Sequence, residues 1–245
     1  RCKDAGTKRF GIHTMLISNE LNYKYMIQTV HMLFEIMELI SSELDINFEF
    51  INIGGGLGIP YKPEMSPFDI EKMGEETVDL FVKFKEKNGN APKLFLESGR
   101  YMTGPHGVLV TKAINYKDIY RKYIGVDACM SSLMRPGIYG AYHHISVPAK
   151  EESLDTEIVD VVGCLCENND KFAIQRELPK IDYGDILVIQ DTGAHGHSMG
   201  FNYNGRLRPK ELLLCKDGSV ELIRREETTA DYFSTLDFES NRIEL

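Results

Sequence analysis

The apolar residues between positions 26 and 44 recur at alternating steps of four and three. They are Met26, Val30, Leu33, Met37, Ile40 and Leu44. This spacing places them on one face of a helix and is typical of an amphipathic helix packed on a core. Ser18 and Asn19 precede the pattern and belong to the residue types that cap helices, so we expect the helix to begin just after them.

Short apolar runs on either side of this helix predict strands. The runs cover residues 10–13, 48–53 and 93–97, and residues 69–86 predict a second helix between the last two. An alternation of strands and helices implies parallel strands joined by right-handed crossovers, in a barrel or in an open sheet. In both architectures ligands bind where the strands end, at their carboxyl edge.

The pattern changes after about residue 105. Short apolar runs at 108–114, 158–164 and 186–190 are separated by turn residues and predict strands. We therefore expect two domains, an α/β domain over residues 1–105 and an all-β domain over residues 106–245. The acidic residues Glu151, Glu152 and Asp155 predict an exposed loop between strands.

Charge and cysteine content narrow the class of protein. The 245 residues carry a net charge of -9 without a basic run, which argues against a nucleic-acid partner. No apolar run has the length of a membrane span and the first residues do not resemble a signal peptide, so we expect no membrane partner. Five scattered cysteines favour a reducing cytoplasm, and the lone C-x-C of Cys164 and Cys166 lacks a second pair for zinc.

Candidate chemistry follows the ends of the predicted strands. His13, the run INIGGGLGIPY with Gly54, Gly55 and Gly56, and the run ESGR ending in Arg100 each occupy such an end. Glycines let backbone N–H groups approach a phosphate, although a tight turn with positive φ angles is the alternative. Arg100 could bind a phosphate or carboxylate in a forked geometry, or lie on the surface.

The second half contains three further polar motifs. These are RPGIYGAYH with Arg135, Tyr139 and Tyr142, then CENND with Cys166 and Glu167, and finally NYN with Tyr203. A cysteine is more often a small core residue than a catalyst. His195 and His197 alternate as on one face of a strand, and we expect a structural or surface role for them rather than metal ligation.

Taken in this order, GGGLG, ESGR, RPGIYGAYH, CENND and NYN resemble the fold-type-III pyridoxal-phosphate decarboxylases, most closely the diaminopimelate decarboxylases. The resemblance covers nearly the whole chain. It implies an α/β plus all-β fold, in which the C-terminal part of an alanine-racemase-like TIM barrel is followed by a β-sandwich or barrel-like domain.

The resemblance also implies the roles of individual residues. Those implied to hold pyridoxal 5′-phosphate are Gly54, Gly55, Gly56, Glu97, Gly99, Arg100, Tyr203 and His13. Those implied to bind the substrate are Arg100, Arg135, Tyr139, Glu167 and Tyr203. The arginines would hold the carboxylate that is not lost, Glu167 would meet the distal amine, and Cys166 would return a proton after carbon dioxide leaves. No metal ligand is implied.

The implied reaction converts meso-2,6-diaminopimelate to L-lysine and carbon dioxide. It is implied for a homodimer with shared active sites, in which Cys166 and Glu167 reach across from the partner subunit. Two alternatives stay open: a decarboxylase for another basic amino acid or carboxylated polyamine, and a non-catalytic half-chain that dimerises. Arg135 favours diaminopimelate, because a substrate with a distal ammonium alone would require an acid there.

Several positions depart from the family pattern. Ser98 and Cys164 stand where the family usually has proline, and Met15 occupies the position of the histidine that stacks on the cofactor ring. Either His13 makes that contact or the methionine packs there. No lysine matches the family's Schiff-base motif, so we expect this chain to be a fragment of a longer enzyme and to be inactive alone.

Overall fold

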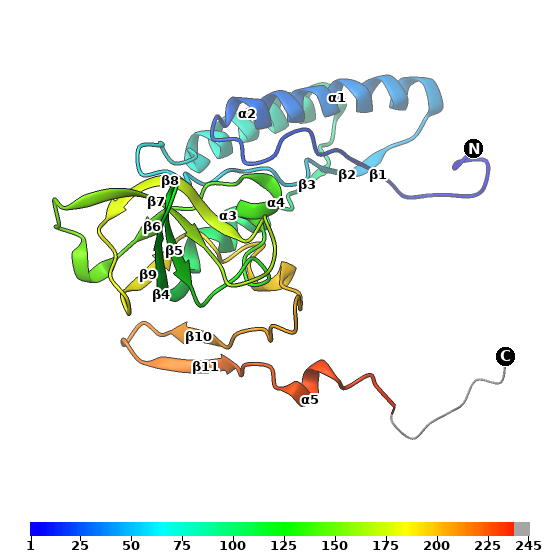
Figure 1. Ribbon diagram of the computed structural model, residues 1–245. Helices are drawn as coiled ribbons and strands as arrows, with labels where there is room; N and C mark the ends of the chain where they lie inside the picture. The colour runs from blue at the N-terminus through cyan, green and yellow to red at the C-terminus, as the bar shows by residue number, and fades with distance from the viewer. Residues whose placement is uncertain (238–245) are drawn as a thin grey trace. The chain divides into compact units, whose positions relative to one another are not determined.

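The computed structural model describes residues 1–237, and these form two compact units (Figure 1). Unit 1 comprises Arg1–Val108 together with Gln190–Ala194. Unit 2 comprises Leu109–Ile189 and the chain from His195 onward. Each unit has its own hydrophobic core.

Unit 1 contains a three-stranded parallel sheet. Its strands are β1 (Phe10–His13), β2 (Phe48–Asn52) and β3 (Lys93–Phe95), paired in the order β1-β2-β3. The predicted alternation of strands and helices is therefore confirmed, and the strands are parallel as expected. The second and third strands end one and two residues earlier than predicted.

Helix α1 (Lys24–Leu44) buries most of the predicted stripe, and its members Met26, Val30, Leu33 and Met37 are at most 3% exposed. Leu44, in the last turn, is 55% exposed.

The predicted caps of this helix are wrong. Tyr23 is the residue that precedes the helix, and its side chain makes no capping bond. The Asn19 side chain instead accepts a hydrogen bond from the Ile59 N–H at 3.0 Å. It therefore holds the loop after β2 rather than the helix.

Helix α2 (Ile70–Asn88) follows the expected signals more closely. The carboxylate of Asp69 caps it by accepting from the Lys72 N–H at 3.0 Å, and Gly89 ends it with a φ of 80°. Its face toward α1 carries an aromatic cluster in which Phe34 stacks on Phe84, with 4.2 Å between ring centroids. The helices thus share the core of unit 1 with the sheet.

After β3 the chain forms two short helices, α3 (Gly99–Thr103) and η1 (Gly104–His106). The segment Gln190–Ala194 lies against them, because the Thr192 N–H donates to the Gly107 carbonyl at 2.8 Å. A Cβ atom on Gly193 would lie 1.9 Å from the Thr103 carbonyl oxygen. Only glycine fits at this contact.

Unit 2 is built on a six-stranded mixed sheet with the order β6-β9-β4-β5-β7-β8. Strands β5 and β7 pair in parallel, and the other neighbours are antiparallel. The strands are β4 (Leu109–Asp118), β5 (Lys122–Val126), β6 (Ile145–Ser146), β7 (Thr156–Val162), β8 (Lys171–Pro179) and β9 (Ile186–Ile189). The sheet curls around apolar residues that include Phe172, Leu187 and Ile189, each at most 1% exposed.

Helices and turns occupy the connections of this sheet. They are α4 (Arg135–Tyr139), η2 (Pro148–Lys150) and η3 (His197–Met199). The prediction that His195 and His197 alternate on a strand is wrong. His195 has a φ of 59°, which an extended strand does not allow, and His197 begins η3.

The described chain ends with a separate hairpin. Strands β10 (Glu211–Leu214) and β11 (Val220–Arg224) pair antiparallel, and α5 (Thr229–Tyr232) follows. Thr228 and Asp231 form a reciprocal capping box at the start of α5. Across the described residues, no helix combines the length and the apolar character needed to cross a membrane.

Candidate functional site

The carboxyl edge of the sheet in unit 1 gathers the first set of predicted residues. The Asn52 side chain donates to Glu97 Oε1 at 2.7 Å and accepts from the Gly54 N–H at 2.9 Å. His13 Nε2 lies 3.8 Å from the same Glu97 oxygen. Residues from the ends of all three parallel strands therefore meet at one point, as the order of elements predicted.

The glycine turn after β2 is held between two neighbouring loops. Gly54 has a φ of 70° and Gly56 a φ of 105°, values that L residues rarely adopt. A Cβ on Gly55 would lie 2.9 Å from the Glu97 carbonyl oxygen. Both interpretations of the glycine run therefore apply. Gly54 and Gly56 have positive φ angles, and all three glycines let the backbone approach neighbouring atoms closely.

Arg100 and Gly99 follow this turn in α3, which begins at Gly99. The Arg100 guanidinium carbon lies 6.0 Å from the centroid of the Tyr61 ring, within the range of a cation–π contact. Its Nε atom is buried and has no hydrogen-bond partner among the described residues. A buried donor without an acceptor is costly, so this position favours an added anion.

Met15 and His13 lie at this edge together. The Met15 methyl carbon would be 3.7 Å from a Cβ on Gly55, so the side chain packs beside the glycine turn. Both side chains are about half exposed. Both residues that could contact the cofactor ring, His13 and Met15, therefore lie at the carboxyl edge of the sheet.

The second set of predicted residues lies in unit 2. Arg135 begins α4 and is only 8% exposed, and its Nη1 lies 2.8 Å from Nε2 of His143. His143 is fully buried, and its carbonyl oxygen accepts a hydrogen bond from Arg176 at 3.0 Å. Tyr139, at the other end of α4, is 62% exposed. Arg135 is thus fixed in orientation by a buried neighbour.

Arg176, which donates to the His143 carbonyl, is itself partly buried, and this burial lowers the pKa of its guanidinium group. The guanidinium carbon lies 4.0 Å from the centroid of the Tyr142 ring.

Cys166 and Glu167 lie in the loop between β7 and β8. Cys166 is exposed, and all five cysteines of the chain are free thiols. The Tyr203 hydroxyl donates to Glu167 Oε2 at 3.2 Å. This bond and the charge of Glu167 raise the pKa of Tyr203 above the ordinary value of a phenol.

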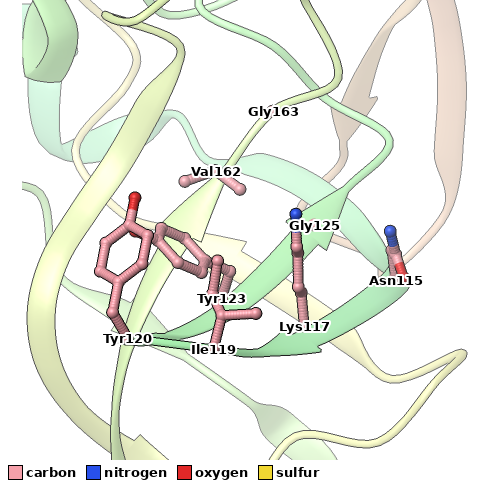
Figure 2. A pocket seen from close by; sticks show the side chains of 8 residues that line it. All are labelled: Asn115, Lys117, Ile119, Tyr120, Tyr123, Gly125, Val162 and Gly163. Carbon is pink, nitrogen blue, oxygen red and sulfur yellow. The ribbon is translucent and has the colours of Figure 1, made fainter.

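Two hollows border the loop of Cys166. The first has a volume of about 300 Å³, and Figure 2 shows the rings of Tyr120 and Tyr123 at one end of it and Lys117 and Asn115 at the other. The second, of about 750 Å³, shares part of this wall and is also lined by Glu167. The loop that carries the predicted thiol therefore faces open space.

The predicted residues therefore fall into two groups, one in each unit. His13, the glycines, Glu97 and Arg100 belong to unit 1, and the other predicted residues belong to unit 2. No cluster of three or more His, Cys, Asp or Glu side chains suited to a metal ion occurs in the described part of the chain.

Three residues in these groups were not singled out from the sequence: Asn52, His143 and Asp170. Each makes its contacts through a buried or partly buried polar atom of the site. His143 and Asp170 close the quoted motifs RPGIYGAYH and CENND, and that is the one signal that could have found them.

Comparisons with known proteins agree with these motifs. The family described as "Pyridoxal-dependent decarboxylase, C-terminal sheet domain" matches residues 23–193. The chain is 48% identical over 229 residues to Protein TabA of Pseudomonas amygdali pv. tabaci, covering 94% of this chain and 54% of that protein. It is 40% identical to a diaminopimelate decarboxylase of Methanothermobacter thermautotrophicus, covering 93% and 53%.

A solved structure gives the same picture. The diaminopimelate decarboxylase from M. jannaschii in co-complex with L-lysine superposes with a TM-score of 0.82 at 36% identity, covering 91% of this chain and 50% of that one. The chain spans about half the length of the curated relatives it matches.

Proposed function

Because the chain belongs to the pyridoxal-dependent decarboxylase family, we propose that the complete protein decarboxylates meso-2,6-diaminopimelate to L-lysine and carbon dioxide. One observation carries the choice of substrate. Arg135 is a second arginine besides Arg100, and it is held rigidly by buried His143. A substrate with a second carboxylate would use such a cation, and one with only a distal ammonium would be repelled by it.

The residues of unit 1 fit the phosphate of the cofactor. The turn of Gly54, Gly55 and Gly56 offers backbone without side chains, and Arg100 has a buried Nε that lacks an acceptor. Glu97, Gly99 and His13 complete the proposed set at the same edge. Pyridoxal 5′-phosphate bound there supplies an electron sink for the carbon that loses its carboxylate.

The residues of unit 2 would act on the substrate. Arg135 and Tyr139 would bind the carboxylate that remains, together with Arg100. Glu167 would accept a hydrogen bond from the distal ammonium, and the Tyr203 hydroxyl donates to the same carboxylate and orients it. The exposed Cys166 Sγ–H would deliver the proton to the carbon from which carbon dioxide has left.

The wider setting of the chain belongs to the same proposal. The three parallel strands would be the last strands of a TIM-like barrel, completed by the part of the protein that this chain does not include. Cys166 and Glu167 would serve the site of the partner subunit in a homodimer. A cytoplasmic location suits an enzyme of amino-acid biosynthesis with free thiols.

The test uses the complete protein, of which this chain is a part, loaded with cofactor. Carbon dioxide release is measured from meso-diaminopimelate, L-lysine and L-ornithine, in the unmodified enzyme, Cys166→Ala, Arg135→Ala and the control Cys215→Ala. We expect turnover on diaminopimelate, a loss of at least about 100-fold in kcat for Cys166→Ala, and loss of the preference for diaminopimelate in Arg135→Ala.

Two results would contradict the proposal. Faster turnover of L-ornithine or L-lysine than of diaminopimelate by the unmodified enzyme would assign it another substrate. An absence of turnover on all three substrates, with the cofactor bound, would favour a non-catalytic role.

A further inference from the structure

We propose that Asp170 is a positioning residue that fixes the loop of Cys166 and Glu167 against the segment leading to Arg135. This inference rests on the proposed function, because it assigns Asp170 a purpose in that reaction. Asp170 itself is only 3% exposed, and both of its carboxylate oxygens already accept backbone N–H bonds.

The carboxylate ties together two segments far apart in sequence. Its Oδ1 accepts from the Met130 N–H at 2.6 Å, and its Oδ2 accepts from the Leu165 N–H at 2.7 Å. Leu165 directly precedes Cys166, and Met130 lies five residues before Arg135. One side chain therefore ties the backbone beside the proposed proton donor to the segment that precedes α4.

Close packing makes this arrangement rigid. A Cβ on Gly163 would lie 2.3 Å from each carboxylate oxygen of Asp170, and a Cβ on Gly137 would lie 2.1 Å from the Asn169 carbonyl oxygen. The backbone of Gly163 also donates to the Asp170 carbonyl at 2.9 Å. Glycines at both contacts let the loop approach α4 with no room to shift.

The burial of this carboxylate is costly, which is why its bonds matter. Burial raises the pKa of Asp170, whereas the two backbone N–H bonds oppose the rise. The two backbone bonds therefore offset part of the cost of burying the charge. Shortening the side chain would free both N–H groups and release the loop.

The consequence for the reaction is a loss of alignment. A misplacement of about 1 Å at a reacting group can cost about 100-fold in rate. Arg135 keeps its own support from buried His143, so only the contact of Glu167 with the substrate should weaken when the loop is released. We therefore expect a change in kcat without a matching change in KM.

The experiment compares Asp170→Asn and Asp170→Ala in the complete protein with a matched control. Asparagine keeps one acceptor oxygen and removes the charge, and alanine removes both acceptors. Asp155→Asn is the control, because it removes the same charge from an exposed loop. Three quantities are measured: hydrogen exchange of the Met130 and Leu165 amides, the rate of Cys166 alkylation by iodoacetamide, and kcat and KM for diaminopimelate.

We expect exchange of the Leu165 and Met130 amides to become at least about tenfold faster in Asp170→Ala. For Asp170→Asn the acceleration should be intermediate, because one acceptor remains. Alkylation of Cys166 should change in the same order, with exposed Cys2 as an internal reference. The value of kcat should fall by about 10- to 100-fold in Asp170→Ala with a clearly smaller rise in KM, and Asp155→Asn should match the unmodified protein.

The proposal is overturned if both amides exchange at unmodified rates in Asp170→Asn and kcat is unchanged. It is also overturned if KM rises as much as kcat falls, since that result would show a general loss of the site. Should Asp170→Ala fail to fold, Asp170→Asn alone decides. If the unmodified enzyme does not turn over diaminopimelate, the proposed function fails, and exchange and alkylation still report whether Asp170 fixes the loop.

Discussion

Replacement of Gly56 by alanine tests the geometry of the glycine turn. Gly56 has a φ of 105°, and a Cβ there would lie 2.4 Å from the carbonyl oxygen of Ile17 and 2.9 Å from its side chain. A left-handed backbone costs an L residue about 1–2 kcal/mol. Forcing an extra carbon into packed surroundings costs about 1–3 kcal/mol more. We expect Gly56→Ala to lower the free energy of unfolding by about 2–5 kcal/mol.

The matched control is Gly74→Ala, in the middle of α2 of the same unit. A Cβ on Gly74 would have no atom within 4 Å, and its φ is not positive. Removing a helical glycine stabilises by roughly 0.5–1 kcal/mol. The two substitutions add the same methyl group to unit 1 and should therefore have opposite signs.

Urea unfolding followed by circular dichroism measures both changes from the midpoint and slope. The reasoning about the turn is refuted if Gly56→Ala unfolds within about 0.5 kcal/mol of the unmodified chain, the usual range for surface substitutions. It is equally refuted if Gly74→Ala destabilises as much as Gly56→Ala, because space and φ would then not decide the outcome.

Three further outcomes are expected. Phe34→Ala should cost about 3–5 kcal/mol in urea unfolding, because the ring is 6% exposed and stacked on a second aromatic ring, whereas Phe34→Leu should cost clearly less. Burial alone would raise the pKa of Asp127, but the hydrogen bonds that its carboxylate accepts from the Lys112 N–H and the Thr111 hydroxyl lower it by more. The pKa of Asp127 is therefore lowered. The carboxylate of Asp127 should stabilise the fold above the ordinary carboxyl pKa, and this contribution to the free energy of unfolding should be lost as the pH falls through the pKa of Asp127 in the folded protein. Asp127→Asn should abolish this part of the pH dependence, measured by urea unfolding between pH 6 and pH 2, a range of about four units around that pKa. Glu167→Gln should lower the pKa of Tyr203, measured by ultraviolet titration against Tyr203→Phe.

The regular elements of unit 1 could be predicted because their signals are local. The stripe from Met26 to Met37 repeats at helical spacing, and Asp69 and Gly89 are ordinary helix signals. The start of α1 could not be predicted in the same way. Asn19 has the chemistry of a cap, but its side chain bonds to Ile59, forty residues later.

The meeting of the polar residues at one edge of the sheet could be predicted from the order of strands and helices alone. Strands joined by right-handed crossovers are parallel, so their ends must lie on one side, and His13, Gly54 and Glu97 meet there. The identity of the residue that joins them was not readable. Asn52 lay inside the apolar run predicted as a strand over residues 48–53, and its two bonds depend on the register of β2 against β3.

The motif CENND shows why the supporting residues were missed. Cys166 is exposed, whereas Asp170 is only 3% exposed and its carboxylate accepts from the Met130 N–H. The sequence shows four strongly polar residues after Cys166 and cannot say which of them turns away from solvent. That depends on Gly163, where any side chain would collide with the carboxylate. A motif of this kind therefore combines residues that meet the substrate with one that holds them, and only the fold separates the two roles.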